Sequence, residues 1–153
     1  MWTGTVESIH IASAAESPTQ SVDQAQAIPG VGLDGDRYAK RQGTFFKPLP
    51  DFELTLIEAE AVEALKRDYG VHITAGEARR NLVTRGVPLN HLVGHEFQIG
   101  EVKIRGIRLC EPCDHLEALT VQGIKDGLHH RGGLRAEVVR GGELRQGDAI
   151  HLL

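Results

Sequence analysis

The chain has only two cysteines among its 153 residues, and it has no excess of positive charge. Because Cys110 and Cys113 are three positions apart, they do not resemble the disulfide framework of a small secreted domain. The 21 acidic side chains outnumber the 17 basic ones and give a net charge of −4, which argues against a dedicated nucleic-acid-binding protein. Any site for an anion must therefore be local.

Long hydrophobic runs are also missing. No run approaches the roughly 20 apolar residues that a membrane-spanning helix needs. The first residues, Met1-Trp2-Thr3-Gly4, lack the charged-then-apolar pattern of a signal peptide. We therefore expect a cytoplasmic protein with neither a membrane nor a nucleic acid as partner. The chain contains no P-loop, no dinucleotide-binding fingerprint and no Gly-x-Ser-x-Gly elbow, so it lacks the signatures of the enzyme classes that use them.

The remaining composition is that of a globular protein. Hydrophobic residues make up 41% of the chain and charged residues 25%, so a hydrophobic core can form. The length suits one domain covering residues 1–153. Eighteen glycines indicate many turns and short strands.

Short alternating patterns predict a mostly β fold. Apolar residues recurring near every second position predict strands at 4–12, 54–57, 81–84, 95–99, 102–109, 134–139 and 149–152. Within 102–109 the apolar positions change parity, so Gly106 is expected to mark a β-bulge. Residues 13–24 are predicted to be a loop, and residues 40–52 an irregular or lid-like segment.

Helical signals are fewer. Apolar positions spaced by three or four residues predict one longer helix from Glu58 to Tyr69, ended by Gly70. Thr74-Ala75-Gly76-Glu77 has the form of a capping box that opens a short turn, and Asp114–Lys125 should contain one or two helical turns. Because strands and helices do not alternate, we predict a mostly antiparallel β-barrel with one longer helix and a few short ones.

The densest group of reactive side chains is Cys110-Glu111-Pro112-Cys113-Asp114-His115. Two thiolates and an imidazole could begin a zinc site, which His129 and His130 could complete. Haem attachment is excluded because Asp114 separates the second cysteine from the histidine. A thioredoxin-like dithiol has the right spacing, but Pro112 directly precedes the second cysteine and no βαβ pattern surrounds it.

A further interpretation makes Cys113 a single activated nucleophile. Pro112 ends a strand, so Cys113 falls near the start of a short helix, where the helix dipole and nearby basic side chains favour a thiolate. An exposed thiolate attacks sulfur or binds a soft metal such as molybdenum. The alternative is that both cysteines are small hydrophobic residues packed in the core.

Basic residues accompany glycine in several places. The groups are Gly35-Asp36-Arg37, Arg79-Arg80-Asn81, Arg105 with Arg108, and His129-His130-Arg131-Gly132-Gly133. Glycine lets a backbone approach an anion closely, and arginine binds phosphate or carboxylate with two donors. If the fold gathers these groups, they form an anion pocket. Otherwise the glycines only make turns and the arginines are solvated.

Five motifs occur in order along the chain. They are Gly32-Leu33-Asp34-Gly35-Asp36-Arg37, Arg80-Asn81-Leu82-Val83-Thr84-Arg85-Gly86, Leu109-Cys110-Glu111-Pro112-Cys113, Gly132-Gly133-Leu134-Arg135-Ala136-Glu137-Val138-Val139-Arg140-Gly141-Gly142 and Gly147-Asp148. In this order they resemble the MOSC domain, which is found at the C-terminus of molybdenum cofactor sulfurases and in many small stand-alone bacterial proteins.

The resemblance implies a β-barrel with one functional cysteine, which Cys113 matches. In the family this cysteine is proposed to carry sulfur as a persulfide received from a pyridoxal-phosphate-dependent cysteine desulfurase, or to ligate molybdenum when molybdopterin is bound. Gly35, Asp36, Arg37, Arg80 and Asn81 match family segments that are expected to line the same pocket. Tyr38 stands where many small members have histidine, and Arg80 where glutamate often precedes asparagine, so the pocket should be more basic than usual.

Three functions follow as hypotheses. The first is a sulfur carrier or molybdenum-cofactor-binding protein with Cys113 as the reactive thiolate or molybdenum ligand. In it, Arg37, Arg80, Arg108 and Arg131 supply positive charge to a phosphorylated pterin or similar anion. The second is a molybdopterin-dependent oxidoreductase that reduces N-hydroxylated compounds. The third is a non-catalytic anion-binding module with inert cysteines.

Overall fold

The computed structural model describes residues 1–153 and contains eleven strands. They are β1 (Gly4–Ile11), β2 (Gln20–Val22), β3 (Gln24–Ile28), β4 (Gly32–Leu33), β5 (Leu54–Glu58), β6 (Leu82–Arg85), β7 (Glu96–Ile99), β8 (Val102–Leu109), β9 (Leu134–Arg140), β10 (Gly142–Arg145) and β11 (Ala149–Leu152). The α-helices are α1 (Ala59–Tyr69), α2 (Asp114–Leu119) and α3 (Ile124–Gly127), and the 3-10 helices are η1 (Pro50–Phe52), η2 (Gly76–Ala78) and η3 (Leu89–Leu92).

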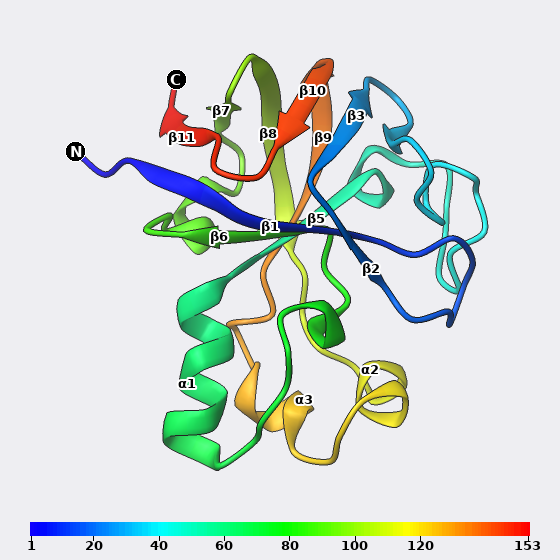
Figure 1. The fold of residues 1–153 in the computed structure, drawn as a ribbon, viewed down its shortest axis with the longest axis vertical. Coiled ribbons are helices and arrows are strands. Elements are labelled where there is room, and N and C mark those ends of the chain that lie inside the picture. Colours follow the sequence, from blue (N-terminus) through cyan, green and yellow to red (C-terminus); the bar gives the residue numbers. More distant parts are fainter.

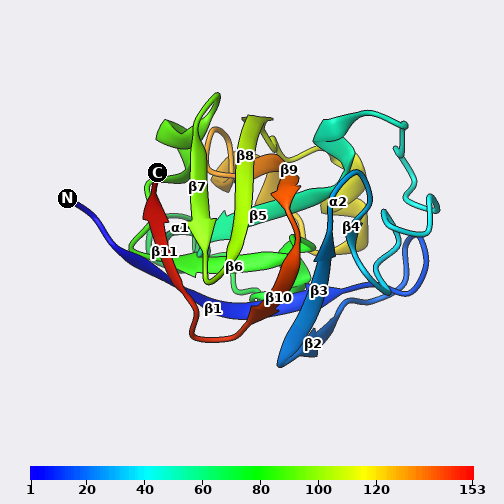
Figure 2. The ribbon, with the colours of Figure 1, turned by 90° about the horizontal axis from the view of Figure 1, so that it is seen from above.

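Seven strands close into a barrel in the order β1-β11-β7-β8-β9-β5-β6 (Figure 2). The barrel closes because β1 pairs with β11 near its start and with β6 along its length. All neighbouring pairs are antiparallel except β5 and β6, which run parallel and are joined through α1. The predicted β-barrel is confirmed, and the structure adds one parallel pair to it.

The barrel interior is filled by aliphatic and aromatic side chains. They belong to a cluster of 20 buried residues, with Phe97 among the largest, that also includes Ala25, Ala27, Leu33 and Leu144 from outside the barrel strands. On β9 the alternation predicted from the sequence is visible, because Leu134, Ala136 and Val138 are buried while the residues between them are not. Such alternation fixes which face of each strand points inward.

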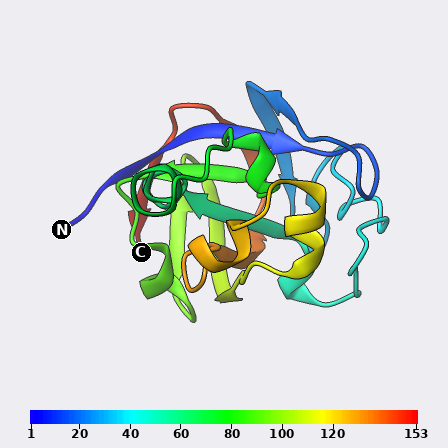
Figure 3. The same cartoon turned by 90° about the horizontal axis from the view of Figure 1, so that it is seen from below.

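The three α-helices lie together at one end of the barrel (Figures 1 and 3). They cover a second hydrophobic cluster of nine buried residues, which includes Leu65, Leu116 and Leu128. The longer helix matches its prediction, and Gly70 ends it in the left-handed conformation with φ 65°. None of the helices has the length and apolar character that crossing a membrane requires.

Two local predictions are confirmed in detail. Thr74 and Glu77 form the reciprocal capping box, with the Thr74 N–H donating to Glu77 Oε1 at 2.8 Å and the Glu77 N–H donating to Thr74 Oγ1 at 3.4 Å. The β8–β9 register shifts between Gly106 and Arg108, which is the expected bulge. The bulge re-aims the end of β8 just before the cysteine segment.

A second sheet of β10, β3 and β4 lies beside the barrel and was not predicted. The segment predicted as a loop over 13–24 also contains β2, which pairs with the end of β1. β2 and β3 consist mostly of glutamine, serine and alanine, and β4 and β10 both begin with glycine, so these strands carry little β-propensity. Residues 40–52 are irregular as expected, apart from η1.

Candidate functional site

The cysteine segment connects the end of β8 to α2. Cys110 is buried, with 2% of its surface exposed, whereas Cys113 is exposed, and both are free thiols. Cys113 is the N-cap residue of α2 with an extended backbone (φ −136°, ψ 172°), and the Glu117 N–H donates to its carbonyl oxygen at 3.2 Å. The predicted position of Cys113, after a strand and at the start of a short helix, is confirmed.

Both cysteines line one pocket whose walls carry four arginines. These are Arg37, Arg79, Arg80 and Arg135. The remaining walls include Tyr38, Thr55, Leu116 and His115, with Glu16 and Glu111 as the acidic members. The pocket therefore holds an accessible sulfur beside several cationic groups, which is the local anion environment expected inside an acidic chain.

Among these four arginines, Arg80 donates the largest number of hydrogen bonds to backbone carbonyl oxygens. Only 8% of its surface is exposed, and its guanidinium donates to three backbone carbonyls: Gly132 at 2.8 Å, Cys110 at 3.0 Å and Ala78 at 3.3 Å. No carboxylate forms an ion pair with it. A buried guanidinium bonded only to neutral oxygens keeps its positive charge available to an anion in the pocket.

Arg135 also reaches the pocket without a full set of partners. Its buried Nε has no hydrogen-bond partner, and its Nη1 donates to the carbonyl oxygen of Asp51 at 3.4 Å. Burial acts to lower the pKa of Arg135, but neighbouring Cys110, Tyr38 and Asp51 together raise that pKa above its ordinary value. Arg135 therefore remains a cation at this wall.

Arg37 and Arg79 complete the basic wall and contact each other. Arg37 Nη2 donates to the carbonyl oxygen of Arg79 at 3.2 Å, and Arg79 Nη1 donates to the carbonyl oxygen of Ser17 at 2.6 Å. Burial lowers the pKa of Arg79, and the like charge of Arg37 lowers it further. Two neighbouring guanidiniums that repel in this way gain from a bound anion.

Asp36 and Gly35 shape the loop that presents Arg37. Asp36 is fully buried, and its carboxylate accepts hydrogen bonds from the Ala12 N–H at 3.0 Å, the Tyr38 N–H at 3.3 Å and Arg37 Nη1 at 3.2 Å. Gly35 has φ 88°, which suits glycine. Neither residue lines the arginine pocket. The structure therefore places them as supports for Arg37.

Asn81 lies inside the barrel wall. Its Oδ1 accepts from the N–H and the hydroxyl of Thr55 at 3.1 and 3.2 Å, and its Nδ2 donates to the carbonyl oxygen of His10 at 3.1 Å. It is fully buried and does not line the pocket. Asn81 therefore joins β1 and β5 directly before β6 begins, and it holds the adjacent Arg80 in place.

Arg108 and Arg131 lie outside the arginine pocket, in contrast to the expected arrangement. Arg108 is half-exposed and pairs with Asp51 at 2.6 Å. Arg131 lies in a different cavity beside Glu58 and Glu60, and its Nη1 is 3.5 Å from Asp68. Arg135 falls within one of the family motifs and Arg79 within one of the basic groups, but the sequence did not predict that either lines the pocket.

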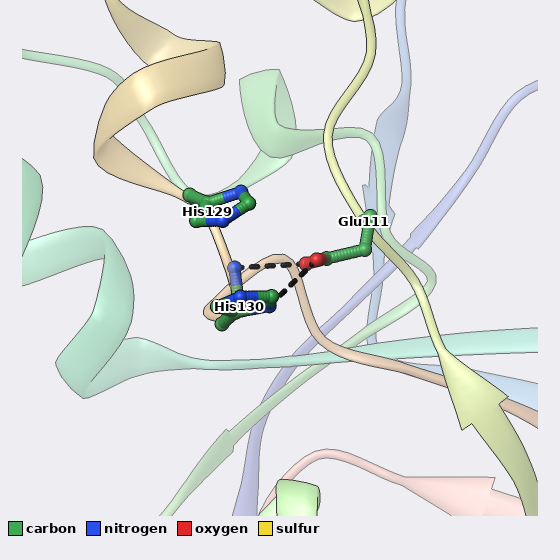
Figure 4. Close-up of side chains that lie close together, drawn as sticks. All are labelled: Glu111, His129 and His130. Atoms are coloured by element: carbon green, nitrogen blue, oxygen red, sulfur yellow. Dashed lines mark hydrogen bonds and ion pairs between the residues drawn. The ribbon is translucent and has the colours of Figure 1, made fainter.

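The fold does not bring together the cysteines and histidines that the sequence suggested as a zinc site. Cys110, Cys113 and His115 line the arginine pocket, while His129 and His130 gather with Glu111 instead (Figure 4). His115 faces the irregular segment 40–52, where its ring meets the edge of Phe45 at a centroid distance of 5.3 Å. Thr44 and Phe45 thereby add to the rim of the pocket.

The family model of the MOSC domain matches residues 35–151. The chain belongs to the MOSC domain family. A search of curated proteins finds no match. Among solved structures, the YuaD protein of Bacillus subtilis is similar, with a TM-score of 0.80, 20% identity and coverage of 98% of this chain and 97% of that one.

Two structures of YiiM share the same architecture. The YiiM protein of Geobacillus stearothermophilus gives a TM-score of 0.76 at 14% identity, covering 98% of this chain and 75% of that one. The YiiM protein of Escherichia coli gives 0.69 at 20% identity, covering 100% and 70%. At such low identity these similarities establish the fold of this MOSC domain and leave its chemistry to the site.

Proposed function

We propose that this MOSC-domain protein is a sulfur carrier in which Cys113 accepts and releases sulfane sulfur. One observation carries the proposal: an exposed thiol shares a pocket with Arg37, Arg79, Arg80 and Arg135. A thiolate and a persulfide anion are both stabilised by nearby positive charge and by the start of a helix.

Two exchange steps describe the carrier. In the first, the Cys113 thiolate attacks the terminal sulfur of a donor persulfide, so that one S–S bond forms, one breaks and the donor leaves as its thiolate. In the second, a nucleophile of the acceptor attacks the terminal sulfur held by Cys113 and the Cys113 thiolate is regenerated. Sulfur moves without any net change in oxidation state, so neither step needs an added oxidant or reductant.

The proposed donor is a pyridoxal-phosphate-dependent cysteine desulfurase in the cytoplasm. After incubation with such an enzyme and L-cysteine, mass spectrometry should show an adduct of about 32 Da, the mass of one sulfur, on Cys113. The Cys110→Ser variant should keep the adduct, and Cys113→Ser should lose it. Wild-type protein that stays unmodified, or an adduct that survives in Cys113→Ser, would contradict the carrier role.

The second candidate is a protein that binds the molybdenum cofactor, with Cys113 as the molybdenum ligand. The phosphate of a pterin would find two suitable donors here: Arg135, whose Nε has no hydrogen-bond partner, and Arg80, which pairs with no carboxylate. A thiolate is a suitable ligand for a soft metal. When bound, that group would supply the redox chemistry needed to reduce N-hydroxylated compounds. In that case Arg80 and Arg135 would hold the phosphate, and the chain would orient the Cys113 thiol toward the metal.

Metal analysis separates the two candidates. Protein purified gently from a host that makes the cofactor should hold roughly one molybdenum per chain if the second is correct, and Cys113→Ser should lose it. Arg80→Met should lose pterin phosphate from such preparations as well. Protein free of molybdenum that still forms the sulfur adduct supports the carrier. Failure of both assays would leave a non-catalytic anion-binding module.

A further inference from the structure

Glu111, His129 and His130 form a compact cluster on the surface (Figure 4). One ligand atom from each side chain can be chosen so that all three lie within 4.8 Å of one another, and all three residues are exposed. Glu111 comes from the cysteine segment, and the histidines come from the turn after α3. Two segments on either side of α2 and α3, with Glu111 and His130 separated by 19 positions, therefore meet at this cluster.

His130 is held in a particular orientation by several contacts. Its backbone is left-handed with φ 61°, a conformation that few residues other than glycine adopt. Glu111 accepts from the His130 N–H at 2.8 Å and lies 2.8 Å from its Nδ1, and Asn90 Nδ2 donates to the His130 carbonyl oxygen at 2.8 Å. The two backbone bonds hold this turn in place, and the contact with Glu111 orients the exposed ring.

The side chains of Glu111 and His130 are close enough to bind one ion together. A carboxylate oxygen of Glu111 lies 2.8 Å from His130 Nδ1. A metal ion that takes the place of the hydrogen between these two atoms would have both as ligands, at the bond lengths of about 2.0–2.2 Å that zinc adopts. The His129 ring lies beside the His130 ring, with 3.8 Å between ring centroids, and brings a second imidazole to the same place.

We propose that Glu111, His129 and His130 form a binding site for a borderline divalent transition ion such as Zn²⁺, Co²⁺ or Ni²⁺. Two imidazoles and one carboxylate suit these ions better than Mg²⁺ or Ca²⁺, which prefer oxygen ligands. Three protein ligands leave a coordination position for water, as in open zinc sites. The exposed surroundings place that position toward solvent.

An ion at this site would cross-link the segment that carries Cys113 to the turn before Gly132. Arg80 already joins the same two segments through the carbonyls of Cys110 and Gly132. Metal binding therefore stabilises the local structure that presents Cys113. Neither thiol belongs to the cluster, so metal binding can be measured separately from the proposed sulfur chemistry, although Glu111 also lines the pocket that contains both cysteines.

Titration of the full chain with Co²⁺ and Zn²⁺ tests the site. We expect one ion per chain by calorimetry, an absorption spectrum of Co²⁺ without a thiolate charge-transfer band, and a rise in melting temperature with Zn²⁺. His130→Asn, whose new side chain tolerates the left-handed backbone, should weaken binding at least about tenfold. His129→Gln should do the same at an ordinary backbone position.

His72→Asn is the matched control, because His72 is an exposed histidine in the segment between α1 and η2. It should bind Co²⁺ with the affinity of the wild type. The proposal is overturned by the absence of stoichiometric binding, by unchanged affinity in both cluster variants, or by a thiolate band in the Co²⁺ spectrum. The sulfur-adduct assay reads a different residue, so failure of the carrier role leaves these outcomes unaffected.

Discussion

Arg80 donates from Nη2 to the carbonyl oxygen of Cys110 at 3.0 Å, and this bond ties a buried cation to the residue where the cysteine segment begins. A second bond, from Nε to the Gly132 carbonyl oxygen at 2.8 Å, joins the glycine turn to the same guanidinium. The side chain that offers charge to the pocket is thus also the one that holds two of its walls together.

Replacing Arg80 with lysine should destabilise the protein. An ammonium cannot reproduce the planar fork that reaches three carbonyls, so one or two buried acceptors lose their donor. We expect a loss of about 1–3 kcal/mol in the free energy of unfolding, measured with urea. The control is Arg145→Lys, since Arg145 is exposed. Equal losses in the two variants would show that the three carbonyl bonds contribute little.

Gly133→Ala should be more damaging than Gly30→Ala. Both glycines have left-handed backbones, with φ 106° and 75°, so both variants bear a backbone cost of about 1–2 kcal/mol. A Cβ at Gly133 would also overlap the carbonyl oxygen of Leu56, whereas nothing lies near one at Gly30. Unfolding curves of the two variants measure the difference, and similar midpoints would mean that β5 yields easily at this point.

Alkylation should distinguish the two cysteines. Cys113 is exposed and Cys110 is buried, so iodoacetamide should label Cys113 in the folded protein and both residues in urea. Peptide mass spectrometry after a time course gives the two rates. Labelling of Cys110 in native protein at the rate of Cys113 would show that the barrel end opens readily.

Stability should fall in mild acid partly because of His10. Burial lowers the pKa of His10 below its ordinary 6.5, so the folded protein keeps the ring neutral where the unfolded chain is protonated. The resulting stabilisation is complete above pH 6.5 and is lost as the pH falls through the folded pKa. The stability advantage of wild type over His10→Gln should therefore shrink in acid, as urea denaturation at several pH values would show. An advantage that is constant with pH would contradict this assignment.

Short-range patterns were sufficient to predict the local structure. The helix ending at Gly70, the Thr74–Glu77 capping box and the bulge at Gly106 each depend on residues within a few positions of one another. The parallel β5–β6 pair depends on contacts between segments that lie on either side of α1, and no short window of sequence contains that information.

Sequence also predicted a local basic site at Cys113 but assigned only some of its cations. Arg37 and Arg80 line the pocket, whereas Arg108 and Arg131 bind Asp51 and Asp68 elsewhere. Arg131 directly follows the left-handed His130, which changes the direction of the chain there. The direction in which an arginine points depends on such turns and on acidic partners in distant segments. The basic residues found next to glycines therefore could not show that Arg135 lines the pocket.

The two hydrophobic clusters imply that the molecule can open in parts. The 20-residue cluster is shared by the barrel and the second sheet, while the nine-residue cluster under the helices includes Leu116, which directly follows His115 at the pocket wall. Local unfolding of a small cluster costs less than global unfolding. Amide hydrogens of α2 and α3 should therefore exchange with deuterium well before those of β8 and β9, because the helical end can open while the barrel stays intact.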